Sequence, residues 1–308
     1  MRLAALIFAL SVTLFGADPP AFVQQVRMAA GTGDFNSARQ QLNLYRKARG
    51  ATAEYIEALS WLGRGELAAK QYGAADENAA EVRRLCLDQI MHRKLDADSS
   101  LPIALGASIE VHAQVAALQG RRDDAIVFLR EEVQRWRGTS ILPRIEKNLN
   151  LLTLEGKPAP PLAISQSLTG RPLQSLAQHA GHPVLLFFWA HWCSDCKAEI
   201  AIIERIQRTY GPRGLVVVAP TQHYGYVAGG TDAPRDVETK YINEVFAQYY
   251  AGLGPVEVPV SEANFANYGV STTPTLVLLD ARGIVRLYNP GALTLAQLAS
   301  KVEELFRR

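Results

Sequence analysis

The chain has 308 residues, of which 48% are hydrophobic and 20% charged, and its formal net charge is +2. This length exceeds the usual size of one domain, so we expect two domains. The composition is that of a globular protein, and the near-neutral charge excludes a strongly basic nucleic-acid-binding or membrane-surface-binding protein.

The amino-terminal residues have the order of a secretory signal peptide. Arg2 is followed by an apolar run from Leu3 to Phe15, and then by the small residues Gly16 and Ala17. The run is shorter than the about 20 apolar residues that span a bilayer. We therefore expect a signal peptide over residues 1–17, cleaved near Gly16/Ala17, and a periplasmic or otherwise extracytoplasmic protein. An uncleaved anchor is the alternative, and no later stretch is expected to cross a membrane.

Residues 18–155 have the apolar spacing of helices. Three turn-like breaks, at 31–37, 70–74 and 119–124, each precede a small residue, namely Ala38, Ala75 and Ala125. This order resembles the turn of tetratricopeptide repeats, in which paired helices stack into a solenoid. We expect an all-α domain, built either of helical repeats or as a generic bundle, that serves as a scaffold or docks a protein partner.

Residues 156–161, with three prolines, predict a stiff linker. Beyond it, β-rich and helical runs alternate, which is typical of an α/β domain with a mixed sheet flanked by helices. We expect this domain to cover residues 156–308. The expected strands are 183–189, 214–219, 275–280 and 284–288, and the expected helices are 196–210, 235–250 and 294–308.

The three cysteines are Cys86, Cys193 and Cys196. Structural disulfides usually need an even set at wide spacing, so the close pair indicates chemistry. The pair follows a buried strand and opens a helix, where free N–H groups and the helix dipole lower the pKa of the first thiol. Cys193 can then attack a disulfide and Cys196 can resolve the mixed disulfide. Zinc sites share the Cys-x-x-Cys spacing, but no further pair of ligands has it, so we expect no metal and no cofactor.

The segment Phe-Trp-Ala-His-Trp-Cys-Ser-Asp-Cys-Lys-Ala-Glu at 188–199 resembles the active-site segment of the thioredoxin superfamily. It is most similar to the TlpA/ResA-like group of exported thiol-disulfide oxidoreductases. A second matching element is Gly269–Thr275 ahead of a buried strand, and the resemblance covers about residues 157–308. It implies a thioredoxin-like fold and a redox-active disulfide between Cys193 and Cys196. It also implies a cis proline at Pro274 and substrate contacts by Trp192, Thr273 and Pro274.

The sequence departs from the family pattern in informative ways. Ser194 and Asp195 stand where Gly-Pro or X-Pro is common, and a carboxylate disfavours a neighbouring thiolate. We therefore expect a more reducing pair than in the strong oxidants of the superfamily. Phe187 stands where cytoplasmic-type thioredoxins have a buried Asp. Glu199 matches a glutamate that tunes the thiol pKa in the TlpA/ResA-like group, which implies proton transfer with Cys196. The alternative for Glu199 is a solvated helix residue.

Three further residues have open roles. His191 either stabilises a thiolate or contacts substrate, or it is a surface residue. His223 lies in a long loop, which is either functional or solvent-facing. Cys86 is expected to be a small buried hydrophobe.

The sequence favours an enzyme that reduces disulfides of other proteins, with electrons arriving from a membrane thiol donor by resemblance. A disulfide oxidase or isomerase would use the same residues at another potential. A thiol peroxidase would have a threonine at the position of Ala190. A partner-docking module built on the helical half is the remaining alternative. No nucleic-acid partner is expected.

Overall fold

The structure is a computed structural model that describes residues 19–307. The predicted signal peptide lies outside the described residues. The chain forms two compact units that divide between Val115 and Ala116. The domain boundary that the sequence predicts between residues 155 and 156 stays a prediction.

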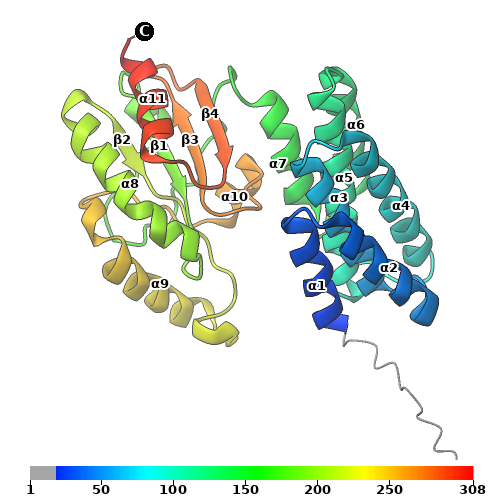
Figure 1. Ribbon diagram of the computed structural model, residues 1–308. Coiled ribbons are helices and arrows are strands. Elements are labelled where there is room, and N and C mark those ends of the chain that lie inside the picture. The colour runs from blue at the N-terminus through cyan, green and yellow to red at the C-terminus, as the bar shows by residue number, and fades with distance from the viewer. Residues whose placement is uncertain (1–18, 308) are drawn as a thin grey trace, which may run out of the picture. The chain divides into compact units, whose positions relative to one another are not determined.

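The first unit is built of helices, as expected (Figure 1). Its helices are α1 (Pro19–Gly31), α2 (Phe35–Arg49), α3 (Ala53–Ala68), α4 (Tyr72–Ile90), the short 3₁₀ helix Leu95–Ala97, and α5 (Ser100–Leu118), which runs into the second unit. Gly65 on α3 allows close packing on α1, because a Cβ there would lie 2.6 Å from the Ala30 carbonyl oxygen. Among the described residues, α5 is long and apolar enough to cross a membrane, so the expectation that no later stretch reaches this length was wrong. Since 67% of that apolar window is buried in the protein, α5 has the character of a core helix.

The three breaks that the sequence singled out share one local geometry. Each has one residue with positive φ, at Gly33 (82°), Lys70 (62°) and Gly120 (83°). In each, the N–H of the residue after it donates to a carbonyl five residues back, which gives the pairs Asp34–Ala29, Gln71–Glu66 and Arg121–Ala116. The alanine that follows is buried in all three turns, at Ala38, Ala75 and Ala125. This shared turn supports the helical-repeat interpretation, which stays a prediction.

The second unit contains α6 (Arg122–Arg135) and α7 (Leu142–Thr153), followed by the α/β part. The latter consists of β1 (Val184–Phe188), α8 (Ser194–Tyr210), β2 (Val216–Val218), α9 (Arg235–Tyr249), α10 (Glu262–Tyr268), β3 (Thr275–Leu279), β4 (Val285–Pro290) and α11 (Leu295–Phe306). All the expected strands and helices are present, and α10 is an additional helix that the sequence did not predict. The strand order is β2-β1-β3-β4, with β1 parallel to β2 and β3 antiparallel to β1 and β4. The predicted α/β fold with a mixed sheet is therefore confirmed.

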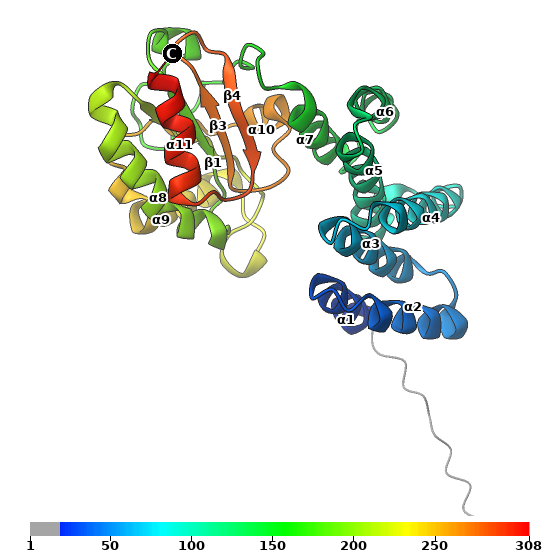
Figure 2. The same cartoon turned by 45° about the horizontal axis from the view of Figure 1, so that its top comes forward.

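Helices cover both faces of this sheet, because alternate strand residues point to opposite sides. Leu185 and Phe187 of β1 pack in one core cluster with apolar residues of α8, α9 and α11. Leu186 and Phe188 pack in a second cluster with residues of α10. Figure 2 shows α11 crossing one face, with α10 beside the sheet on the other side. The redox segment that follows β1 packs in the first cluster, through Trp189, Cys193 and Cys196.

Helix α7 packs on the α/β part within the second unit. The Asn150 side chain donates a 2.9 Å hydrogen bond to the carbonyl of Tyr268, at the end of α10. The next residue, Gly269, has φ +60°, and a Cβ there would lie 2.8 Å from the backbone of α7 at Glu146. Glycine is required at this position both by the left-handed backbone and by the close approach of α7.

Candidate redox site

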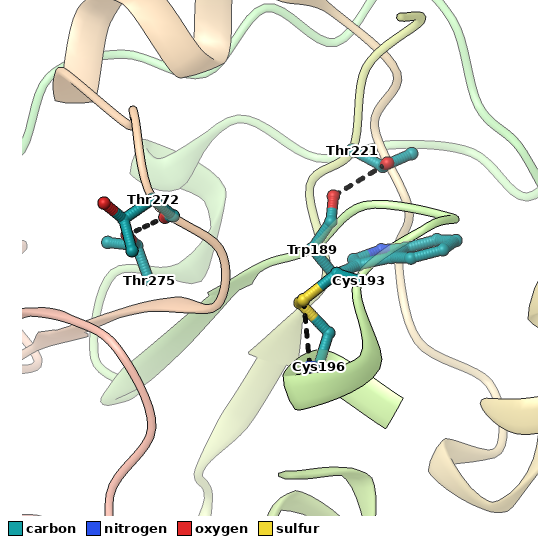
Figure 3. The surroundings of a disulfide bond; sticks show 6 residues. All are labelled: Trp189, Cys193, Cys196, Thr221, Thr272 and Thr275. Atoms are coloured by element: carbon teal, nitrogen blue, oxygen red, sulfur yellow. Dashed lines mark hydrogen bonds between the residues drawn. A yellow bond between two sulfur atoms is a disulfide. The ribbon is translucent and has the colours of Figure 1, made fainter. Parts of the chain in front are cut away.

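The two cysteines of the motif lie where β1 gives way to α8 (Figure 3). Cys193 is the N-cap residue of α8, and Cys196 lies in its first turn. The two form a disulfide, and the Cys196 N–H donates to Sγ of Cys193 at 3.0 Å. The helix dipole and this N–H stabilise negative charge on the Cys193 sulfur once the disulfide is opened. Both cysteines are buried.

The segment ahead of the cysteines is anchored to the chain that follows β2. Trp189 Nε1 donates to the carbonyl of Ala219 at 3.0 Å, and the hydroxyl of Thr221 donates to the carbonyl of Trp189 at 3.0 Å (Figure 3). Trp189 is fully buried, as is Phe187, and both rings lie against Tyr250. The floor below the redox pair is therefore apolar, without the buried aspartate of cytoplasmic-type thioredoxins.

A cis-proline turn lies beside the disulfide. The Thr273–Pro274 peptide bond is cis. Thr275, the first residue of β3, pairs with Phe188, the last residue of β1, which brings the turn to the edge of the sheet where the cysteines lie. Figure 3 shows Thr272 and Thr275 in the surroundings of the disulfide. Oγ1 of Thr273 is buried and has no hydrogen-bond partner among the described residues.

Glu199 lies one turn after Cys196 on α8, and residues at this spacing share a helix face. Its side chain is only 3% exposed, so the alternative of a solvated helix residue was wrong. Burial raises the pKa of Glu199, and the Leu293 N–H, which donates to its Oε1 at 3.1 Å, opposes that rise. A buried carboxyl group with a raised pKa is suited to exchange a proton with a neighbouring thiol.

Both histidines near the site are buried, so the surface alternatives for them were wrong. Nε2 of His191 lies 3.3 Å from Oε1 of Glu238 on α9. Nε2 of His223 lies 2.8 Å from the hydroxyl of Thr239, and its hydrogen-bonding direction depends on the tautomer. Glu238 could not be predicted from the sequence, because nothing there distinguishes it from Asp236, the other acidic residue in the first turn of α9.

Cys86 lies on α4 as a buried free thiol, in agreement with the expected small buried hydrophobe. Burial raises the pKa of its thiol to about 12. The thiolate, which is the reactive form, is therefore scarce at neutral pH. Within residues 19–307, no group of three His, Cys, Asp or Glu side chains is arranged to hold a metal ion.

Comparison with known proteins gives the family. The sequence profile of the thioredoxin-like domain matches residues 174–306. The thioredoxin-like protein YneN of Bacillus subtilis is 30% identical over 149 residues, which is 48% of this chain and 79% of that protein. The chain belongs to the thioredoxin-like family.

Other thioredoxin-like proteins are similar to the same half of the chain. The thiol-disulfide oxidoreductase ResA of Geobacillus thermodenitrificans is 27% identical over 49% of this chain and 77% of that protein. The crystal structure of a putative thiol:disulfide interchange protein DsbE from Chlorobium tepidum is 25% identical, with a TM-score of 0.39, and covers 49% of this chain and 96% of that one. The predicted class of enzyme, a thiol-disulfide oxidoreductase, is confirmed by the similarity to ResA and by the cysteine pair.

Proposed function

We propose that this protein is an extracytoplasmic reductase of disulfides in other proteins. The observation that carries the proposal is the pair itself: a disulfide at the start of α8, in which Sγ of Cys193 accepts a helix N–H, beside a cis-proline turn.

The reaction begins from the reduced pair. The Cys193 thiolate attacks one sulfur of a substrate disulfide, forms a mixed disulfide and releases the other substrate sulfur as a thiolate. Cys196 then loses its proton to Glu199 and attacks Sγ of Cys193. The second substrate sulfur leaves as a thiolate, which water or the protonated Glu199 re-protonates. Two electrons have passed to the substrate, and the Cys193–Cys196 disulfide is formed.

The surface next to Cys193 can receive an extended polypeptide. Trp192 is 49% exposed, so it offers an apolar flank directly beside the nucleophile. The backbone of Thr273 and the ring of Pro274 form the opposite side in this proposal.

The residues between the cysteines favour reduction. Asp195 adds a carboxylate to the first turn of α8, and the rigid proline of many relatives is missing. Negative charge near Cys193 opposes its thiolate, which stabilises the disulfide relative to the open pair. The apolar floor of Phe187 and Trp189 opposes the thiolate in the same direction by desolvation.

Equilibration with glutathione tests the direction. We expect a potential more negative than about −200 mV, whereas strong disulfide oxidants lie near about −120 mV. The variant Asp195→Pro is the matched comparison and should shift the potential toward the oxidants. A wild-type potential near that of the oxidants would overturn the reductase assignment in favour of an oxidase or isomerase.

Location, electron donor and docking belong to the same proposal. The order of residues 1–17 supports export, and cell fractionation with amino-terminal sequencing of the mature protein tests it.

Trapping with Cys196→Ser holds Cys193 on its partner, and a trapped membrane thiol protein would identify the donor. The exposed side chains of Met28 and Leu44 support a docking surface on the helical unit. Replacing both with Glu should abolish the partner complex and leave the reduction of an artificial disulfide intact.

A further inference from the structure

A buried polar pair lies beside the redox cysteines. His191 stands two residues before Cys193, and its Nε2 lies 3.3 Å from Oε1 of Glu238 in the first turn of α9. The side chains are 1% and 0% exposed. The contact does not have the geometry of a hydrogen bond, so Nε2 has no hydrogen-bond partner within the described part of the chain. Buried polar atoms normally have such partners, and this pair differs from other buried contacts because Glu238 also binds the loop beside it.

Glu238 also fixes the long loop between β2 and α9. Its Oε1 accepts the N–H of Tyr224 at 2.6 Å, and its Oε2 accepts the N–H of Gly225 at 3.0 Å. Gly225 has φ +83°, a backbone that favours glycine and lets two successive N–H groups converge on one acceptor group. The loop then closes on itself, because the Ala233 N–H donates to the carbonyl of Gly225 at 2.9 Å. One carboxyl group therefore joins α9, this loop and the segment ahead of Cys193.

Aromatic rings surround the pair and reach the surface. The His191 ring has edge contacts with Tyr224, Tyr226 and Tyr241, at centroid distances of 5.5, 5.4 and 5.3 Å. Tyr224 also lies edge-on to Trp192 at 5.5 Å. We call Trp192, Tyr224 and Tyr226 the aromatic wall. Trp192 is its half-exposed end, next to the nucleophile.

Burial favours the neutral form of His191. Burial lowers the pKa of His191, and the carboxyl group of Glu238 opposes this. Lys197 and His223 lower the pKa further. A neutral imidazole can pack edge-on among tyrosine rings without the desolvation cost of a buried cation.

We propose that Glu238 and His191 are positioning residues that hold the aromatic wall in place beside Cys193, where it receives an apolar side chain flanking a cysteine of a polypeptide substrate. The proposal rests on the proposed function, because that reaction is disulfide exchange with a polypeptide. A wall held before binding loses less conformational freedom when the substrate binds. A small disulfide has no flanking side chain and gains less from the wall.

The experiment uses the full chain with insulin as the polypeptide disulfide and bis(2-hydroxyethyl) disulfide as the small one. We expect Glu238→Gln to raise KM for insulin at least fivefold, with kcat within twofold of the wild type. The ratio of kcat/KM for insulin to kcat/KM for the small disulfide should fall at least fivefold. The double variant with His191→Gln should be no more than twofold worse than either single variant, because both substitutions break one unit.

The chain contains a matched control pair. Nε2 of His179 lies 3.3 Å from Oε1 of Glu257, is buried, and also has no hydrogen-bond partner among the described residues. His179 precedes β1 in the chain, and its pair with Glu257 does not include the Glu238 carboxyl group that holds the β2–α9 loop. Glu257→Gln should leave the ratio of the two substrates within twofold of the wild type.

Several outcomes would overturn the proposal. Activity on insulin and on the small disulfide could fall by the same factor, the ratio could stay unchanged, or the effects of the two substitutions could multiply. If Glu238→Gln does not fold, Tyr224→Leu removes the ring between His191 and Trp192 and leaves the backbone contact to Glu238. It should raise KM for insulin selectively, and an unchanged ratio again refutes the wall. The ratio of the two substrates can be measured for reduction or for oxidation. A wild type that only oxidises dithiols would refute the proposed reduction, and the ratio measured for oxidation would still test the aromatic wall.

Discussion

The substitution Glu199→Gln separates the effect of a buried charge from that of side-chain shape. Burial raises the pKa of Glu199 above its ordinary value of 4.5. As pH rises above 4.5, the unfolded chain loses this proton while the folded chain keeps it, so the stability of the wild type falls. The slope approaches about 1.4 kcal/mol per pH unit and flattens once pH exceeds the folded pKa. Glutamine has no such titration, and its Oε1 can keep the hydrogen bond from Leu293, worth about 1 kcal/mol.

We therefore expect the variant and the wild type to differ by no more than about 1 kcal/mol below pH 4.5, and the variant to become progressively more stable above it. Urea denaturation of the oxidised proteins from pH 4 to 8 measures this, because the disulfide keeps the cysteines from titrating. Glu303→Gln is the control with the opposite sign, since the hydrogen bond from Arg213 lowers the pKa of Glu303. Its wild type gains stability as pH rises from that lowered pKa to the ordinary value of 4.5, so the series for this control is extended below pH 4. Parallel curves for Glu199→Gln and the wild type would refute the buried-carboxyl argument.

Three further substitutions test the packing. Gly269→Ala should destabilise the protein by more than about 1–2 kcal/mol, the cost of left-handed strain, because its Cβ also meets α7. The control Gly283→Ala, with φ +74° and open space around its Cβ, should show the strain alone in urea denaturation. Thr221→Val should cost about 1–3 kcal/mol by leaving the buried carbonyl of Trp189 without its donor; a change within 0.5 kcal/mol (about the error of such data) would contradict this. Gly65→Ala should cost about 1–3 kcal/mol by overpacking the contact of α3 with α1, and an unchanged thermal midpoint would refute the close approach.

Local patterns in the sequence were sufficient for the fold and the cysteine pair. The continuous apolar run at 183–189 predicts a strand that is buried on both faces, and all five residues of β1 are buried. Alternation along the strand determines which face of the sheet each side chain covers. The chemistry of Cys193 follows from being the residue between a strand and a helix, which is a property of neighbours in sequence. The seven-residue helix α10 was missed because it is too short for a periodic signal to stand out.

What surrounds the cysteines was decided by tertiary structure alone. Burial of Glu199 depends on α11 and the loop before it, and burial of His191 depends on α9 and the β2–α9 loop, none of which is local to either residue. The sequence alone does not show whether a polar side chain on a helix faces water or a neighbouring element. The sequence could therefore predict which sulfurs form the redox pair, while only the packing of distant segments determined which carboxyl groups and rings are buried in the same part of the fold.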